Sequence, residues 1–298
     1  MKRLQILGHL TAFFSIFVWG ITFIFTKLLL VPFTPVEIMF YRLVLAVLAL
    51  FIISPPRLSG IKLDRHALQE EWKIMVAGLC GVTLFILLQN IALSYTLAAN
   101  VSVLISTAPL FTALVSRLVL NERLKANFFL GFTAAMAGII LIAFNGSLVL
   151  KLNPLGDLLS ILAALVWAFY SVVIRKISAG GSAMLTVTHR VFFYGLLFAL
   201  PVLPLFEFRL DLERLTVLSN LLSLLFLGVV ALALCYITWN VAVSILGPVK
   251  ASSYIYMVPL VTIVVSALVL HESITLMAGI GMALVLIGMA LSEREKAG

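Results

Sequence analysis

The sequence predicts an all-α polytopic membrane protein, with ten transmembrane helices arranged as two inverted five-helix repeats. Its 298 residues are 63% hydrophobic and only 11% charged, and the mean hydropathy is +1.21. A soluble domain of this length carries far more charge on its surface. The apolar residues also fall into blocks of about 20, the length that crosses roughly 30 Å of hydrocarbon. In addition, the two halves of the chain resemble each other.

Each apolar block is expected to be a helix, because a segment in hydrocarbon must satisfy its own backbone hydrogen bonds. Outer-membrane strands would instead alternate polar and apolar residues, and these blocks do not. Prolines such as Pro32, Pro35 and Pro248 mark the ends of neighbouring helices. The ten helices are expected at residues 8–31, 36–54, 73–94, 97–119, 125–144, 154–175, 183–205, 218–240, 248–270 and 275–292.

The distribution of basic residues predicts which way the chain crosses the membrane. Thirteen of the 20 lysines and arginines lie beside spans on the side that holds both termini, three lie on the opposite side and four lie inside spans. The positive-inside rule therefore predicts that both termini lie in the cytoplasm. We expect the spans to cross the inner membrane. Although the net charge is +8, most basic residues stand in short loops beside spans, so nucleic acid is not an expected partner.

The two halves of the chain are related by a shift of about 150 residues. A shift of 150 gives 17 identities in 52 positions over residues 90–141, and it pairs Asn90 with Asn240. A shift of 148 pairs Trp19 with Trp167. This is more identity than apolar composition alone explains.

Each half contains five spans, so the second half enters the membrane the opposite way up. We expect the first repeat at residues 1–146 and the second at residues 147–298. Two inverted copies create a pseudo-two-fold axis in the membrane plane, a construction that suits alternating access in secondary transporters. A receptor or a membrane enzyme has no comparable need for it.

Some of the repeated residues also resemble a known family. Residues 93–102 read LSYTLAANVS, residues 120–124 read LNERL, and Trp19 is followed by Gly20. These segments resemble the EamA domain of the drug/metabolite transporter superfamily, and a second copy around residues 251–272 fits less closely but in register. The resemblance covers nearly the whole chain and implies a central cavity lined mainly by helices one, three, four, six, eight and nine. Family members include amino-acid exporters of the YddG type, other metabolite exporters, and relatives that act on sugars or nucleotide-sugars.

Two arginines inside spans are candidates for substrate binding. Arg42 and Arg190 are paired by the shift of 148, and each lies about five to seven residues inside its span. An arginine near the midplane costs roughly 2.5–3.5 kcal/mol on insertion scales, which binding a substrate carboxylate or forming a gating ion pair would justify. Snorkelling toward the headgroups, or bonding to backbone carbonyls, is the alternative. For Lys27 and Arg117, which lie near span ends, snorkelling is the favoured interpretation.

Aromatic and polar residues inside the spans complete the expected substrate-binding site. A cavity for a small amphipathic solute needs apolar and aromatic walls with a few polar groups. Interhelical packing and interhelical hydrogen bonds are the alternative roles for these residues. The aromatic candidates are Trp19, Phe23, Trp167, Tyr170 and Trp239. The polar candidates are Thr22, Gln89, Asn90, Asn100, Ser102, Tyr254 and Tyr256.

Several motifs that would indicate other functions are missing from the sequence. No phosphate-cradling P-loop supports ATP-driven transport, and Thr275 stands where a zinc motif beginning at His271 would need its second histidine. No carboxylate lies near the middle of a span, and no catalytic set of side chains suggests an enzyme. No cofactor and no metal are therefore expected.

We therefore expect a secondary transporter that exports small amphipathic metabolites by alternating access, with amino acids as the leading substrate class. Aromatic walls and basic residues suit a zwitterion or a carboxylate better than a lipophilic cation. Multidrug efflux is the alternative among transporters, and a lipid flippase or an intramembrane enzyme is the alternative from another class. The expected partners are a small-molecule substrate and membrane lipid, and the sequence is compatible with a monomer.

Overall fold

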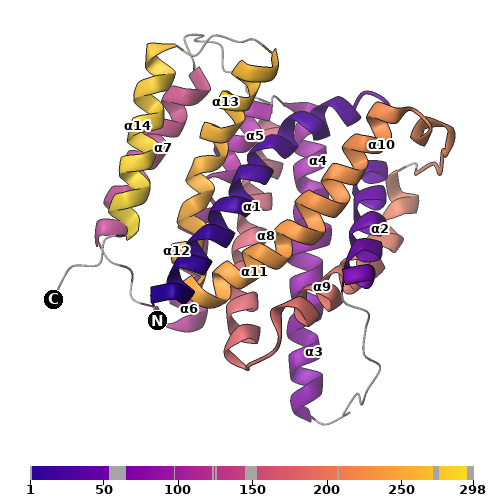
Figure 1. Cartoon of the computed structure of the whole chain (residues 1–298), viewed down its shortest axis with the longest axis horizontal. Helices are drawn as coiled ribbons and strands as arrows, with labels where there is room; N and C mark the ends of the chain where they lie inside the picture. The colour runs from indigo at the N-terminus through magenta and orange to yellow at the C-terminus, as the bar shows by residue number, and fades with distance from the viewer. Residues whose placement is uncertain are drawn as a thin grey trace.

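The computed structural model is a bundle of helices (Figure 1). Within the described part of the chain, all regular elements are helical. Eight helical segments there are long and apolar enough to cross a membrane, and two shorter apolar helices bring the total to ten, as expected. The structure describes residues 2–53, 65–96, 98–122, 124, 126–144, 153–206, 208–270 and 275–293.

The first half supplies five helical spans. Span one is α1 (Lys2–Leu29), span two is α2 (Pro35–Ile53) and span five is α7 (Ala126–Phe144). Span three joins α3 (Arg65–Gly78), a π-helical stretch η1 (Leu79–Leu84) and α4 (Phe85–Tyr95). Span four consists of α5 (Ala98–Ile105) and α6 (Ala108–Leu120).

The second half repeats this order. Span six is α8 (Pro154–Ala179), span seven is α9 (Met184–Ala199) with the 3-10 helix η2 (Leu200–Phe206), and span ten is α14 (Leu276–Glu293). The short 3-10 helix η3 (Glu213–Leu215) precedes span eight. Span eight joins α10 (Leu218–Leu225), the π-helical η4 (Phe226–Leu234) and α11 (Cys235–Leu246). Span nine joins α12 (Pro248–Ser253), the 3-10 helix η5 (Tyr254–Tyr256) and α13 (Met257–Leu270).

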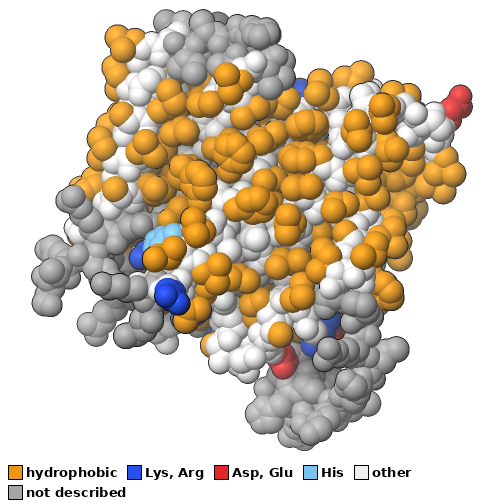
Figure 2. Space-filling model, viewed as in Figure 1, with side chains coloured by type: hydrophobic (Ala, Val, Ile, Leu, Met, Phe, Trp, Pro, Cys, Tyr) orange, Lys and Arg blue, Asp and Glu red, His pale blue; other side chains and the backbone are white. Residues whose placement is uncertain are grey.

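The outer surface of the bundle is apolar, as contact with lipid requires. Large hydrophobic side chains such as Leu118, Leu130 and Leu222 are exposed along the helices. Figure 2 shows such side chains spread over the visible face, with the charged side chains near its ends. A soluble protein rarely exposes so large an apolar patch. The surface therefore identifies a multi-pass membrane protein.

The helices of one half pack against the corresponding helices of the other half. Span one contacts spans eight and nine, and its counterpart, span six, contacts spans three and four. In the same way span two packs on span eight while span seven packs on span three, and α7 pairs with α14. These reciprocal contacts are what a two-fold relation between the halves predicts, and they interlock the halves into one core.

Glycines set the antiparallel pairing of α7 with α14. A Cβ at Gly138 would lie 2.5 Å from the carbonyl oxygen of Gly281, and a Cβ at Gly131 would lie 2.5 Å from that of Gly288. The earlier residue of α7 therefore faces the later residue of α14, so the fifth helices of the two halves run in opposite directions. The inverted relation is visible directly in this pair.

Two irregularities occur at corresponding places in both halves. The π-helical stretches η1 and η4 both lie in the third helix of their half. The fourth helix of each half also changes geometry, between α5 and α6 just before Pro109 and at η5 just before Pro259. Pro109 and Pro259 account for these changes within the expected spans 97–119 and 248–270, because proline lacks the N–H that a continuous α-helix needs.

A basic residue caps the third helix of each half. Lys27 Nζ donates to the carbonyl oxygen of Leu93 at 2.6 Å and to that of Thr96 at 3.1 Å. Arg175, its partner under the shift of 148, donates from Nη1 to the carbonyl oxygen of Ser244 at 2.5 Å. Cations at a helix C-terminus satisfy free carbonyls and oppose the negative end of the helix dipole. Snorkelling, the interpretation favoured for Lys27, is therefore not its main role.

A buried carboxylate anchors the start of α2. The Glu37 side chain is 2% exposed, and its Oε1 lies 3.1 Å from Nη2 of Arg214. Arg214 also bonds Asp211 Oδ2 at 2.9 Å and the carbonyl oxygen of Pro32 at 2.5 Å. This cluster fixes the connection between spans seven and eight onto the turn between spans one and two.

Candidate functional site

A cavity lies between the two halves, where seven of the spans meet. Spans one, three, four, six, eight and nine line it as the resemblance implied, and span two contributes through Arg42. The cavity measures about 50 Å³, which is room for a few water molecules, so a larger solute requires the walls to move apart. Its lining residues are Trp19, Thr22, Phe23, Arg42, Phe85, Ile86, Gln89, Ile105, Trp167, Leu232, Tyr236, Ile255 and Val258.

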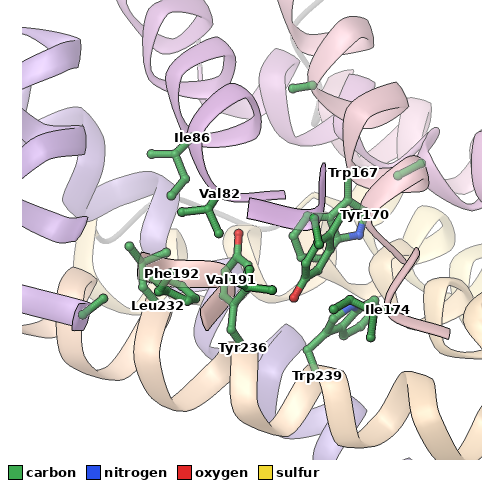
Figure 3. Packing of buried hydrophobic residues seen from close by; sticks show 14 of the residues in the cluster. Val82, Ile86, Trp167, Tyr170, Ile174, Val191, Phe192, Leu232, Tyr236 and Trp239 are labelled. Atoms are coloured by element: carbon green, nitrogen blue, oxygen red, sulfur yellow. The ribbon is translucent and has the colours of Figure 1, made fainter. Parts of the chain in front are cut away.

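A cluster of aromatic rings forms one wall of the cavity. The centroids of Trp19 and Trp167, which the repeat pairs, are 5.2 Å apart and the rings are nearly perpendicular at 89°. Tyr236 lies 5.7 Å from each of them. Figure 3 shows Trp167 and Tyr170 from α8 beside Tyr236 and Trp239 from α11. Edge-to-face pairs of this kind stabilise one another, so the wall is a packed unit.

Carbonyl groups of the π-helical stretches hold two of these rings in place. Trp19 Nε1 donates to the carbonyl oxygen of Ala231 at 2.8 Å, and the Tyr236 hydroxyl donates to that of Gly81 at 2.6 Å. Gly81 and Ala231 correspond under the shift of 150. A π-helical turn disturbs the regular bonding of the helix, and π-bulges are frequent at functional sites. The irregular turns thus orient the aromatic wall.

Arg42 brings a positive charge to the cavity, and no described residue forms an ion pair with it. The residue is 4% exposed, and its Nε and Nη1 atoms are buried without a hydrogen-bond partner in the described part of the chain. A buried polar group normally has a partner, and an unpaired buried charge is costlier still. Among the described residues, no acidic side chain lines the cavity. The guanidinium group therefore faces a space in which a solute can supply the missing acceptors.

Arg190, the partner of Arg42 under the repeat, has a different environment. It forms an ion pair with Glu71 of α3, and the Tyr194 hydroxyl also donates to that carboxylate. The Arg190 side chain is 41% exposed. The structure does not bring it to the cavity, so the two arginines that the repeat pairs have different surroundings.

The expected site residues divide into three groups. Six of them line the cavity: Trp19, Thr22, Phe23, Arg42, Gln89 and Trp167. Tyr170 and Trp239 pack directly behind the wall, with centroids 5.1 Å and 5.7 Å from that of Trp167. The remaining six do not line this cavity: Asn90, Asn100, Ser102, Arg190, Tyr254 and Tyr256.

Several of the residues outside the cavity have structural partners instead. Asn90 donates to the carbonyl oxygen of Pro35 at 3.0 Å, and Asn100 donates to Thr96 Oγ1 at 3.2 Å. The Tyr254 hydroxyl lies 2.6 Å from Nδ1 of His9 in α1. These polar groups tie neighbouring helices together, which was the alternative role weighed from the sequence.

Seven cavity residues are absent from the set expected from the sequence: Phe85, Ile86, Ile105, Leu232, Tyr236, Ile255 and Val258. Most are apolar, so composition does not distinguish them from other membrane residues. The repeat carries a usable signal, since the shift of 150 pairs Ile105 with Ile255 and Ile86 with Tyr236. Together with Trp19 and Trp167, three pairs of lining residues are therefore related by the repeat.

Comparison with known proteins agrees with the fold and the repeat. Residues 6–144 and 154–293 each match the EamA-like transporter family. An uncharacterized transporter of Archaeoglobus fulgidus is 30% identical, and the match covers 97% of this chain and 98% of that protein. A probable terminal-alkyne amino-acid exporter of Streptantibioticus cattleyicolor is 27% identical over 86% of this chain and 83% of that protein. A solved crystal structure with 18% identity superposes over 96% of both chains with a TM-score of 0.75, which shows a shared fold.

Proposed function

The chain belongs to the EamA-like transporter family, and from this premise we propose that it exports small amphipathic carboxylates, with amino acids as the first candidates. It does so by alternating access as a secondary transporter. The pseudo-two-fold relation between the halves supports this mechanism, because exchanging the conformations of two inverted halves turns an outward opening into an inward one. The substrate site lies at the interface between the halves, where such an exchange leaves it in place.

The proposal rests on the environment of the Arg42 side chain. A buried guanidinium group with no counter-ion among the described residues lines the cavity next to aromatic side chains. Guanidinium groups bind carboxylates through charge-assisted and often bidentate hydrogen bonds. The aromatic wall supplies the apolar surface for the rest of the solute. Trp19, Thr22, Phe23, Gln89 and Trp167 complete the proposed site around Arg42.

The aromatic wall also favours a second candidate function, efflux of lipophilic cations, because aromatic faces attract cations. Arg42 argues against it, since two positive charges in one low-dielectric cavity repel each other. The relative named as a probable terminal-alkyne amino-acid exporter, at 27% identity, supports the same substrate class as Arg42 does.

Counterflow in proteoliposomes tests the proposed function. Vesicles preloaded with unlabelled solute are offered the same solute in labelled form, using phenylalanine, glucose and tetraphenylphosphonium in parallel. We expect labelled phenylalanine to accumulate, and glucose and the cation to stay at the level of protein-free vesicles. Accumulation of the cation alone would favour efflux of lipophilic cations and contradict the proposal.

We further propose that the protein resides in the inner membrane with both termini in the cytoplasm. The excess of lysine and arginine on the side of the termini, thirteen against three, supports this orientation. Single cysteines at Gly180 and Thr216, in a background without Cys80 and Cys235, test it. In intact cells a membrane-impermeant thiol reagent should label the cysteine at position 216 and spare the one at position 180. The opposite pattern would invert the topology.

A further inference from the structure

The cavity is charged on one side only. Arg42 supplies a cation, and no aspartate or glutamate is found among the thirteen lining residues. Carboxylates on the neighbouring spans are engaged elsewhere, Glu37 with Arg214 and Glu71 with Arg190. An amino acid carries an ammonium group as well as a carboxylate. The described cavity offers an ionic partner to the carboxylate and none to the ammonium group.

The hydrogen-bonding groups around the cavity show the same imbalance. Arg42 Nε and Nη1 and Trp167 Nε1 are buried donors that have no acceptor in the residues the structure describes, and neither side chain is able to accept a hydrogen bond. The hydroxyl of Thr22 already donates to the carbonyl oxygen of Trp19 at 2.7 Å, and that of Tyr236 donates to Gly81. A bound group that only accepts hydrogen bonds, such as a carboxylate, therefore satisfies what the cavity lacks. An ammonium group, which only donates, meets only neutral oxygen atoms and a nearby positive charge.

The non-aromatic polar side chains of the cavity come from one half of the chain. Thr22, Arg42 and Gln89 all belong to the first half. Their repeat partners, Tyr170, Arg190 and Trp239, do not line the cavity. The aromatic and aliphatic side chains come from both halves: Trp19, Phe23, Phe85, Ile86 and Ile105 from the first, and Trp167, Leu232, Tyr236, Ile255 and Val258 from the second. A bound solute therefore places its carboxylate toward the first half, while apolar side chains of both halves surround the rest of it.

From this arrangement we infer that the site recognises a carboxylate and an apolar tail and does not require an ammonium group. The inference rests on the proposed function and narrows its substrate class. Apolar and aromatic monocarboxylates without an amine are substrates of the same site, bound about as well as the amino acids of the same size.

Three compounds with the same aromatic ring and a similar chain separate the contributions. Phenylalanine carries both charged groups, phenylpropanoate carries the carboxylate alone, and phenethylamine carries the ammonium alone. Tryptophan fluorescence is a suitable readout of binding, because Trp19, Trp167 and Trp239 lie in or behind the cavity wall. The fourth tryptophan, Trp72, is 65% exposed and is replaced by phenylalanine to remove its background. The titrations use the full-length W72F protein in detergent at neutral pH.

We expect phenylalanine and phenylpropanoate to bind with dissociation constants within about threefold of each other. Phenethylamine should bind roughly tenfold to a hundredfold more weakly, the range that a charge-assisted hydrogen bond supplies. Arg42→Gln in the same background should weaken both carboxylates to the level of phenethylamine. Arg190→Gln, which removes a similar charge outside the cavity, should leave all three dissociation constants unchanged.

The outcomes distinguish this inference from the proposed function. If phenylalanine binds and phenylpropanoate is at least about tenfold weaker, the ammonium group is recognised and the inference is wrong, while amino-acid export stands. If phenethylamine binds best, the cavity is a cation site and the inference is overturned. If neither carboxylate changes the fluorescence, or if neither displaces labelled phenylalanine in counterflow, both this inference and the proposed function are wrong.

Discussion

Replacing Arg42 with methionine should make the empty protein more stable while it removes substrate binding. Arg42 is buried, and its Nε and Nη1 atoms have no partner in the described part of the chain. Methionine keeps much of the length of the arginine side chain and carries no charge. The substitution therefore removes an uncompensated cation from the bundle without opening a large cavity. Most substitutions of buried residues destabilise a protein, so the expected sign is unusual.

The size of the effect follows from the cost of an intramembrane arginine. Insertion scales give roughly 2.5–3.5 kcal/mol for arginine at the centre of a helix. Part of that cost is already relieved by the cavity, so a gain of about 1–3 kcal/mol is reasonable for Arg42→Met. With a shift of about 2–4 °C per kcal/mol, the value for proteins somewhat smaller than this one, the unfolding midpoint should rise by about 2–12 °C. Binding of a carboxylate should weaken at least tenfold.

Thermal unfolding of the purified protein in detergent, without substrate, measures this change. Arg190→Met is the matched control, since it removes an arginine that is ion-paired and 41% exposed. Loss of such a pair costs about 0–1 kcal/mol, so this variant should unfold at the same temperature or slightly lower. A lower midpoint for Arg42→Met would mean that the charge is stabilised in the empty protein. That result would refute the conclusion that Arg42 is an unpaired buried charge whose partner is the bound ligand.

Two further predictions concern the frame around the site. Glu37→Gln should lower the free energy of unfolding by about 1–3 kcal/mol, because it leaves Arg214 without its buried partner, and denaturation in detergent measures the loss. An effect below about 0.5 kcal/mol would place this pair among ordinary surface pairs. Gly138→Val should reduce the yield of folded protein, since its Cβ would lie 2.5 Å from a carbonyl oxygen of α14. Gly279→Ala, where nothing lies within 4 Å, is the control and should fold normally in size-exclusion chromatography.

The fold was largely predictable because the membrane restricts the possible structures so strongly. Apolar blocks of membrane length must be helices, and an odd number of them per repeat must invert the second copy. What the sequence did not indicate was local geometry. The π-helical stretches η1 and η4 contain no proline, the residue type that would have indicated an interruption of the α-helix. The changes of geometry before Pro109 and Pro259 had that local signal.

The candidate site was predictable only in part, because repeat symmetry does not determine chemistry. Arg42 and Arg190 look equivalent in the sequence, whereas in the structure Arg42 lines the cavity and Arg190 pairs with Glu71 of another helix. Asn90 and Gln89 are adjacent polar residues, and the helix turns one toward Pro35 and the other into the cavity. Polarity selected candidates, whereas the direction of each side chain decided which of them line the cavity.

Counterflow of labelled phenylalanine into proteoliposomes measures whether Arg42 binds the substrate. Wild-type protein, Arg42→Gln and Arg190→Gln are reconstituted at equal density, with folding checked by size-exclusion chromatography before reconstitution. We expect initial rates at low substrate concentration to fall roughly tenfold to a hundredfold for Arg42→Gln and to stay near the wild-type value for Arg190→Gln. Wild-type rates for a folded Arg42→Gln protein would show that Arg42 does not bind the substrate.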